Sequence, residues 1–211
     1  MQCAPAKWSS SDEMAVDALG ELVAGLEWTP GAMRPAGLLT VVCEARARGA
    51  AHVVECGCGL SSVVLARLAA RTGGRLTTLE HDAGWAERVR ADLAVDGLGA
   101  HARVLHAPLA SHPLALTACG WYDAGVVENA LDGERIDVLV VDGPPAYEPS
   151  DALARYPALP AFRAGLAAGA AVILDDAARA GERRVLARWA AETGLRFALR
   201  TDGIAIADAR A

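Results

Sequence analysis

The sequence lacks the features that would place it in a membrane, on a nucleic acid or outside the cell. Its 211 residues contain no uninterrupted apolar stretch of about 18 residues or more, and the opening MQCAPAKWSSSDE has no apolar h-region. The formal net charge is −6 and the 20 basic residues are scattered, whereas a nucleic-acid or anionic-membrane partner would require a concentrated basic surface. We therefore expect a soluble, cytoplasmic protein with no nucleic-acid or membrane partner.

Cysteine is also scarce and lacks the spacing of a disulfide framework. An odd number of cysteines without such spacing favours reduced thiols inside a cell. The CxC pair has no second ligand pair, so we expect no zinc there. The five are Cys3, Cys43, Cys56, Cys58 and Cys119.

Apolar periodicity and turn residues predict an alternating α/β order in one domain, with 53% hydrophobic residues to form its core. Ser11 or Asp12 can cap a first helix in DEMAVDALGELVAGL, and a second helix follows in AGLLTVVCEARARG. LRFALR, a turn and IAIA predict a terminal antiparallel hairpin on an otherwise parallel sheet. Between these segments we expect strands at 52–56, 75–80, 102–106, 136–142 and 170–176, and helices near 60–71, 83–94 and 179–193.

The run VVECGCGLSS combines a strand, a glycine turn and the start of a helix. Gly57 and Gly59 fill the first two places of a GxGxxG dinucleotide motif, but Ser62 takes the third. Glu80, 21 positions after Gly59, can accept bonds from both hydroxyls of a ribose. Glu55 would repel a pyrophosphate and attract a cationic sulfonium, which favours S-adenosylmethionine over NAD. The alternative is an ordinary βα turn followed by a surface glutamate.

VVECGCGLSS, TTLEHD, VLVVDGPP and VILDDAAR, in this order and spacing, resemble the class I S-adenosylmethionine-dependent methyltransferases from about Trp28 to Ala207. The resemblance implies a Rossmann-like, doubly wound α/β sheet of seven strands, mostly parallel, with a C-terminal antiparallel hairpin and helices on both faces. It divides one domain into an N-terminal helical lid segment, 1–50, and a cofactor-binding region, 51–211. The cofactor contacts that we expect are Glu55, Gly57, Cys58, Gly59, Ser61, Ser62, Glu80, His81, Ala107, Pro108, Asp142 and Gly143.

Three aspartates end two neighbouring strands and so converge at the carboxyl edge of the sheet. Asp142, Asp175 and Asp176 resemble the metal triad of catechol O-methyltransferase and of magnesium-dependent sugar O-methyltransferases. Their oxygens would suit Mg²⁺, which would hold an acceptor hydroxyl and lower its pKa. The alternative is that Asp142 contacts cofactor or substrate while the other two cap a helix.

The general base stays open, because Pro145 stands where catechol O-methyltransferases carry a lysine. Candidates are Asp142, Tyr147, His112 and, with less support, His81. Aromatic and flexible side chains should wall the substrate site, the alternative being core or dimer packing. The substrate residues that we expect are Trp28, Met33, Trp121, Tyr122 and Tyr156, while Trp85 and Trp189 are assigned to the core.

Together these features predict a methyltransferase (EC 2.1.1.-) acting on a small molecule, most simply on a hydroxyl of a secondary metabolite or sugar in natural product biosynthesis. Metal-independent N- or O-methylation and a non-catalytic S-adenosylmethionine-binding homologue are the alternatives. An NAD enzyme is disfavoured by Glu55 and Ser62, and an aminopropyl transferase by the missing polyamine-binding acidic pattern. The sequence leaves open whether the protein forms a homodimer.

Overall fold

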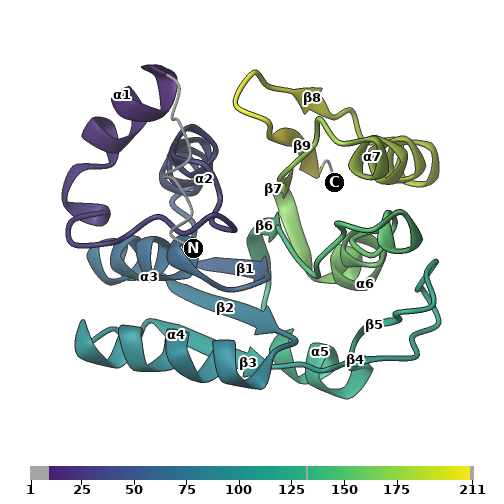
Figure 1. Ribbon diagram of the computed structural model, residues 1–211, viewed down its shortest axis with the longest axis horizontal. Coiled ribbons are helices and arrows are strands. Elements are labelled where there is room, and N and C mark those ends of the chain that lie inside the picture. Colours follow the sequence, from purple (N-terminus) through teal and green to yellow (C-terminus); the bar gives the residue numbers. More distant parts are fainter. Residues whose placement is uncertain (1–9, 132, 210–211) are drawn as a thin grey trace, which may run out of the picture.

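The computed structural model describes residues 10–131 and 133–209, which form a central sheet of seven strands between two layers of helices (Figure 1). The strand order is β3-β2-β1-β6-β7-β9-β8, with β9 antiparallel to both of its neighbours and the other pairs parallel. This arrangement confirms the expected fold. The strands are β1 (His52–Cys56), β2 (Arg75–Glu80), β3 (Ala102–His106), β6 (Ile136–Val141), β7 (Leu166–Leu174), β8 (Ala198–Leu199) and β9 (Ala205–Ala209).

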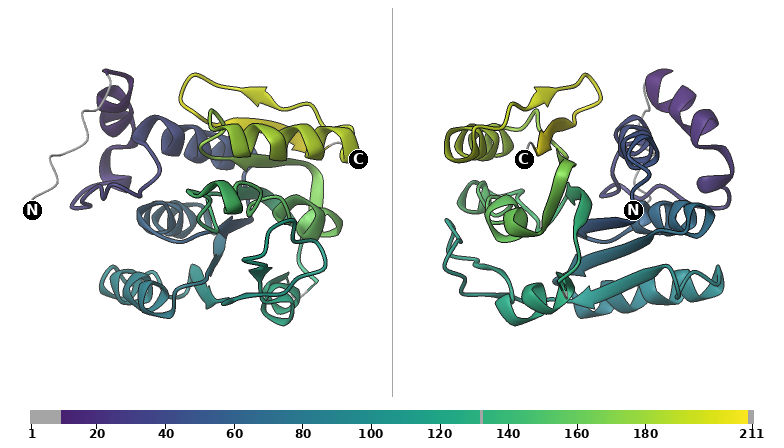
Figure 2. Two further views of the ribbon diagram at one scale, coloured as in Figure 1. Left: turned by 45° about the vertical axis from the view of Figure 1, so that its right-hand side comes forward. Right: turned by 180° about the vertical axis from the view of Figure 1, so that it is seen from behind.

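The helices divide between the two faces of the sheet, as the two views of Figure 2 show. One layer contains α2 (Pro35–Ala47), α3 (Leu60–Thr72) and α4 (Ala83–Val95), with α1 (Ser10–Leu19) packed on α2. The other layer contains α5 (Ala124–Leu131), α6 (Ala158–Phe162) and α7 (Ala180–Thr193). Each layer forms its own hydrophobic core with one face of the sheet.

The central strands are buried along most of their length because both of their faces are covered. In β1, Val53 packs into the core on the α3 side, whereas Val54 and Cys56 pack into the core on the α6 side. All five residues of β1 are buried, including His52 and Glu55. This is the pattern of a parallel sheet between helices rather than that of a sheet with one wet face.

Strand register brings the carboxyl ends of the central strands to one edge. Cys56 is paired with Leu79 of β2 and with Val141 of β6, and Val141 is paired in turn with Leu174 of β7. The residues that follow these positions therefore emerge side by side. Open α/β sheets bind ligands at this edge, where the strand order reverses.

The segments between the expected elements contain short elements that periodicity did not predict. They include α5, α6, the two-residue pair β4 (Leu109–Ala110) and β5 (Trp121–Tyr122), and the 3-10 turns η2 (Pro149–Asp151) and η3 (Arg163–Gly165). The first helix is shorter than the expected DEMAVDALGELVAGL, because α1 ends at Leu19 before Gly20, whose φ is +50°, and the 3-10 turn η1 (Gly20–Leu22) follows. Elements this short show too few periods for a pattern, so tertiary packing determines them. In the part of the chain that the structure describes, no helix is long and apolar enough to span a bilayer.

Candidate functional site

A cavity of about 360 Å³ opens at the carboxyl edge of the sheet, within the size range of small-molecule sites. The turns after β1, β2 and β6 form its floor, and the segment before α2 closes one side. Its walls are Thr29, Gly31, Ala32, Met33, Gly57, Cys58, Gly59, Leu60, Ser61, Glu80, His81, Asp82, Trp85, Tyr122, Asp142, Gly143, Pro144, Pro145 and Tyr147. Most of the cofactor contacts expected from the sequence thus lie around one hollow.

The turn after β1 depends on glycine because two backbones pass within contact distance. Gly57 has φ +87°, and a Cβ added there would lie 3.1 Å from the Cα of Gly143. A Cβ on Gly143 would lie 2.6 Å from the Tyr122 hydroxyl. At Gly59, by contrast, a Cβ would meet no protein atom within 4 Å. Gly57 and Gly143 let the two loops cross, and Gly59 leaves open space in the cavity wall.

Glu55 lies beneath this turn and does not line the cavity, contrary to the expectation of a direct cofactor contact. Its fully buried carboxylate accepts hydrogen bonds from the hydroxyls of Ser61, at 2.6 Å, and of Ser62. Ser62 Oγ also accepts from the Gly59 amide at 3.0 Å. Burial raises the pKa of Glu55 to about 7, although the serine hydroxyls favour its ionised form. Glu55 and Ser62 therefore hold the start of α3 and shape the turn from below.

Glu80 does line the cavity, at the end of β2. Its Oε2 accepts from the Cys58 amide at 3.1 Å, and its Oε1 accepts from the Asp82 amide at 2.8 Å and contacts His81 Nδ1 at 2.7 Å. Burial alone would raise the pKa of Glu80, but the bonds from His81 and the two amides outweigh it and lower that pKa. The pKa of His81 is raised in return, because the imidazolium is bonded to this carboxylate. Glu80 is thus an ionised acceptor facing the cavity.

The cavity carries negative charge. Glu80, Asp82 and Asp142 line it, and among the lining residues that the structure describes there is no arginine or lysine. A dinucleotide pyrophosphate would meet these carboxylates with no arginine or lysine beside them, and His81 on the same wall is already paired with Glu80. A sulfonium or ammonium group would be attracted. The charge of the site therefore agrees with the preference for S-adenosylmethionine over NAD.

Three further expected residues lie on the wall near Asp142. Met33 is buried, Tyr147 is exposed at the rim with the Arg179 guanidinium 5.4 Å from its ring centroid, and Tyr122 is fully buried. The Tyr122 hydroxyl has no hydrogen-bond partner among the described residues. Burial raises the pKa of Tyr122 well above its usual value, so the hydroxyl stays protonated and can donate to a ligand.

Other expected site residues point elsewhere. Trp121 is buried in the core on the α6 side, and His112 packs edge-on against it with ring centroids 5.2 Å apart. Tyr156 donates a hydrogen bond to Glu192 of α7 at 2.6 Å. Trp28 donates from Nε1 to the Met33 carbonyl at 3.0 Å. It thus positions a residue of the cavity wall but does not itself line the cavity. The structure thus places none of these four side chains on the cavity wall, and the same holds for Ala107 and Pro108.

Two residues of the site were not anticipated. Trp85, expected in the core, is 37% exposed, lines the cavity and donates from Nε1 to the Cys58 carbonyl at 2.7 Å. Its place five residues after Glu80, at the start of α4, was a signal that could have identified it. Trp189 is fully buried, as expected. The second unanticipated residue is Arg155, which lies at the same edge of the sheet beside Asp142.

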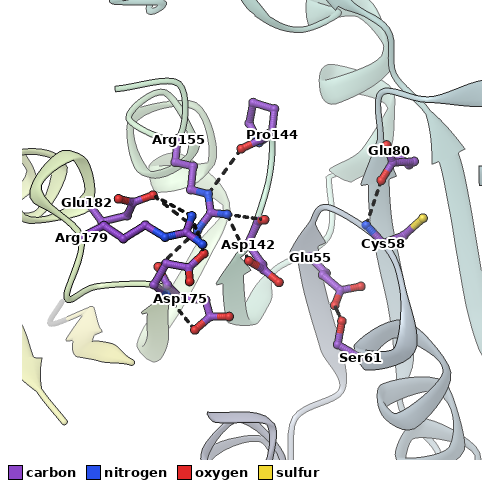
Figure 3. A network of polar contacts seen from close by, with 11 residues as sticks. Glu55, Cys58, Ser61, Glu80, Asp142, Pro144, Arg155, Asp175, Arg179 and Glu182 are labelled. Carbon is purple, nitrogen blue, oxygen red and sulfur yellow. Dashed lines mark hydrogen bonds and ion pairs between the residues drawn. The ribbon is translucent and has the colours of Figure 1, made fainter. Parts of the chain in front are cut away.

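Arg155 lies close to Asp142 and Asp175, as Figure 3 shows, and it also contacts Asp176. The carboxylates of Asp142, Asp175 and Asp176 offer oxygens within 4.8 Å of one another, a donor set that by itself suits a hard divalent cation. The Arg155 guanidinium contacts Asp142 Oδ1 and Asp176 Oδ2, each at 3.2 Å. Arg179 contacts the same oxygen of Asp176 at 2.9 Å. Two of the three potential metal ligands are therefore already paired with guanidinium groups.

The pKa values of Asp142 and Asp175 are raised, chiefly by burial. Burial, followed by the nearby Asp175 charge, raises the pKa of Asp142 well above its usual value, while Arg155 opposes this shift. The pKa of Asp175 rises to about 6, for which burial and the charge of Asp176 are the main causes. Asp142 is consequently a stronger base than an exposed aspartate, and it is the one member of the triad on the described cavity wall.

Residues 54–177, more than half of the chain, match the model of a family described as a methyltransferase domain. The chain belongs to this family. Sheet order, glycine turn and acidic strand ends together make it a class I S-adenosylmethionine-dependent methyltransferase. No curated protein matches the chain.

Solved structures similar to this methyltransferase share its fold over nearly the whole chain. The O-methyltransferase TomG from Streptomyces achromogenes, solved with S-adenosylmethionine, is 19% identical with a TM-score of 0.59, over 97% of this chain and 92% of its own. An O-methyltransferase from Bacillus cereus, solved with the demethylated cofactor, is 16% identical with a TM-score of 0.57, over 98% and 94% of the two chains. At these identities the likeness shows the fold of the methyltransferase and leaves its acceptor open.

Proposed function

We propose that the protein transfers the methyl group of S-adenosylmethionine to an oxygen of a small-molecule acceptor, with Asp142 as the general base. The observation that carries this proposal is the position of Asp142 in the same cavity as the glycine turn and Glu80. The cofactor carries its own activated methyl group, so the protein has to place an acceptor oxygen in line with it and remove a proton.

In the proposed reaction, the acceptor oxygen attacks the methyl carbon while the carbon–sulfur bond breaks. The sulfur keeps the electron pair of that bond and becomes a neutral thioether, and the hydroxyl proton moves to the Asp142 carboxylate. The raised pKa of Asp142 supports this role, because a base works best when its pKa lies near the operating pH. We assign the ribose hydroxyls of the cofactor to Glu80, whose carboxylate is ionised and faces the cavity.

The charge of the cavity supports an acceptor that is neutral or cationic. A phosphorylated or carboxylated acceptor would meet Asp142 and Glu80 with no arginine or lysine on the described wall, where His81 already pairs with Glu80. We therefore favour an uncharged hydroxylated metabolite or sugar, with the Tyr122 hydroxyl as a hydrogen-bond donor to it. A role in natural product synthesis is in keeping with the solved neighbour TomG, which takes part in tomaymycin synthesis.

Calorimetry followed by a turnover assay tests the proposal. S-adenosylmethionine and its demethylated product should bind the purified protein and NAD should not. Incubation with a panel of hydroxylated metabolites should then yield products heavier by one methylene, detected by mass spectrometry. Binding of NAD in place of both cofactor forms would refute the assignment, and cofactor binding without turnover on any acceptor would favour the non-catalytic homologue.

The variant Asp142→Asn tests the base. Loss of a general base lowers kcat by about 10²-fold to 10⁴-fold, whereas affinity for the demethylated cofactor should change little. Glu128→Gln, which removes an exposed carboxylate on α5, is the matched control. An Asp142→Asn enzyme that retains most of its kcat would show that the proton leaves by another route.

A further inference from the structure

Arg155 is a buried, permanently charged group at the carboxyl edge of the sheet. It comes from the segment between η2 and α6, and only 2% of its side chain is exposed. A guanidinium this deeply buried needs partners for its charge and for all of its N–H groups. The structure supplies these partners from the ends of two strands.

Every nitrogen of the guanidinium is engaged. Nη2 donates to the Asp142 carbonyl at 2.8 Å and to Asp142 Oδ1 at 3.2 Å, whereas Nη1 donates to the Asp175 carbonyl at 3.3 Å and to Asp176 Oδ2 at 3.2 Å. Nε donates to the Pro144 carbonyl at 3.4 Å, and Glu182 Oε1 lies 3.7 Å from Nη1. Arg155 thus joins the end of β6 to the end of β7, as Figure 3 shows.

The carboxylate oxygens that Arg155 contacts are the ones that a resident divalent cation would need as ligands. Mg²⁺ requires close, nearly octahedral coordination by oxygen and gives up its water reluctantly. Here two of the three carboxylates pair with a guanidinium that cannot lose its charge, and Asp176 Oδ2 is shared with Arg179. A second cation among the same oxygens would be repelled by the first.

The lining of the cavity is also evidence against a resident divalent cation. Of the three aspartates, the described cavity wall includes Asp142 and neither Asp175 nor Asp176. An ion held by all three would therefore have one of its three carboxylate ligands on the described wall that an acceptor would face. The residues present do not fit a resident Mg²⁺ that chelates the acceptor.

We propose that Arg155 takes the place of a divalent metal as the fixed cation of this site, so that methyl transfer is independent of metal. Arg155 is a positioning residue: it holds the Asp142 carboxylate toward the cavity by bonding both its Oδ1 and its backbone carbonyl. Metal-independent methyl transfer rests on the proposed function. Cation binding is measured without turnover, so the proposal about Arg155 and the proposed function can fail separately.

Binding of Mn²⁺, used as a spectroscopic substitute for Mg²⁺, tests the proposal on protein dialysed against EDTA. Wild-type protein and the variant Asp175→Asn should both show no saturable Mn²⁺ binding by electron paramagnetic resonance up to about 1 mM. Affinity for the demethylated cofactor and methyl transfer should be equal with Mg²⁺ and with EDTA. Saturable Mn²⁺ binding to the wild type that Asp175→Asn abolishes would overturn the proposal, as would activity that only Mg²⁺ restores.

A variant of Arg155 provides a second test, in which Mn²⁺ binding should appear rather than stay absent. Arg155→Met leaves Asp142 without its paired cation and Asp176 with Arg179 alone, so this variant should show the saturable Mn²⁺ binding below about 1 mM that the wild type lacks. Arg46→Met, an exposed change on α2, should not. Arg155→Lys keeps the positive charge, so it should again show no saturable Mn²⁺ binding and should recover part of the kcat that Arg155→Met loses. A folded Arg155→Met protein without any gain in Mn²⁺ affinity would overturn the proposal, and the wild-type measurement decides the question if this variant does not fold.

Discussion

Replacing Glu80 with glutamine should weaken cofactor binding strongly while changing the shape of the site very little. The carboxylate has three N–H partners: the Cys58 amide at 3.1 Å, the Asp82 amide at 2.8 Å and His81 Nδ1 at 2.7 Å. In Glu80→Gln one of the two acceptor atoms becomes an NH₂ group, which faces a donor whichever way the amide turns. The ribose would then lose a charged acceptor, and the turn at Cys58 or at Asp82 would lose a bond.

A hydrogen bond to a charged group contributes about 1.5–3 kcal/mol, so loss of one ribose bond should weaken binding by about 10-fold to 150-fold. Isothermal titration with S-adenosylmethionine and with its demethylated product measures this change directly. Glu87→Gln on α4, which removes an exposed carboxylate paired with Arg90, is the matched control and should leave affinity unchanged. Affinity within threefold of wild type in Glu80→Gln would refute the assignment of Glu80 to the ribose.

Three further changes probe the same cavity. Gly59→Val should reduce cofactor affinity with little loss of thermal stability, because φ is 173° and the site of the added Cβ is open; an unchanged dissociation constant would place the cofactor elsewhere. Tyr122→Phe should leave the melting temperature unchanged, since its hydroxyl has no described partner, but lower kcat/KM by about tenfold, and equal kcat/KM would exclude a donor role. The raised pKa of His81 means that its contribution to stability is present below about pH 6.5 and lost as pH rises through the folded-state pKa. His81→Gln should therefore lower the melting temperature more at about pH 6 than at about pH 9, and an equal loss at both would contradict the pairing with Glu80.

The elements that the sequence predicted well are those with the most regular patterns. The strand at 52–56 and the strand at 75–80 begin and end as expected, because each is an apolar run closed by a glycine turn or a charged residue. Between the predicted strands at 102–106 and 136–142 the sequence predicted no element, yet this region contains β4, β5 and α5. Two-residue strands and an eight-residue helix carry too little periodicity to be distinguished from loop.

Aromatic residues were the least predictable part of the site. Trp121 and Tyr122 are adjacent on β5, but Trp121 packs among core side chains whereas Tyr122 reaches the cavity. Trp85 and Trp189 both lie on helices, yet one is half-exposed beside the glycine turn and the other is fully buried. Which face of an element meets solvent, core or ligand depends on its neighbours in space, and a single sequence does not record them.

The sequence by itself determined the class of the site. Gly57, Gly59, Glu80 and Asp142 each follow a predicted strand, and a parallel sheet with alternating helices brings the carboxyl ends of such strands to one edge. Tertiary structure alone decided how the acidic triad is neutralised. Arg155 is 13 residues from Asp142 and 21 from Asp176 in the chain, and only the packing of its segment against the ends of β6 and β7 buries its charge between them. Charge compensation depends on distances in space, which the folded chain sets and the order of residues does not.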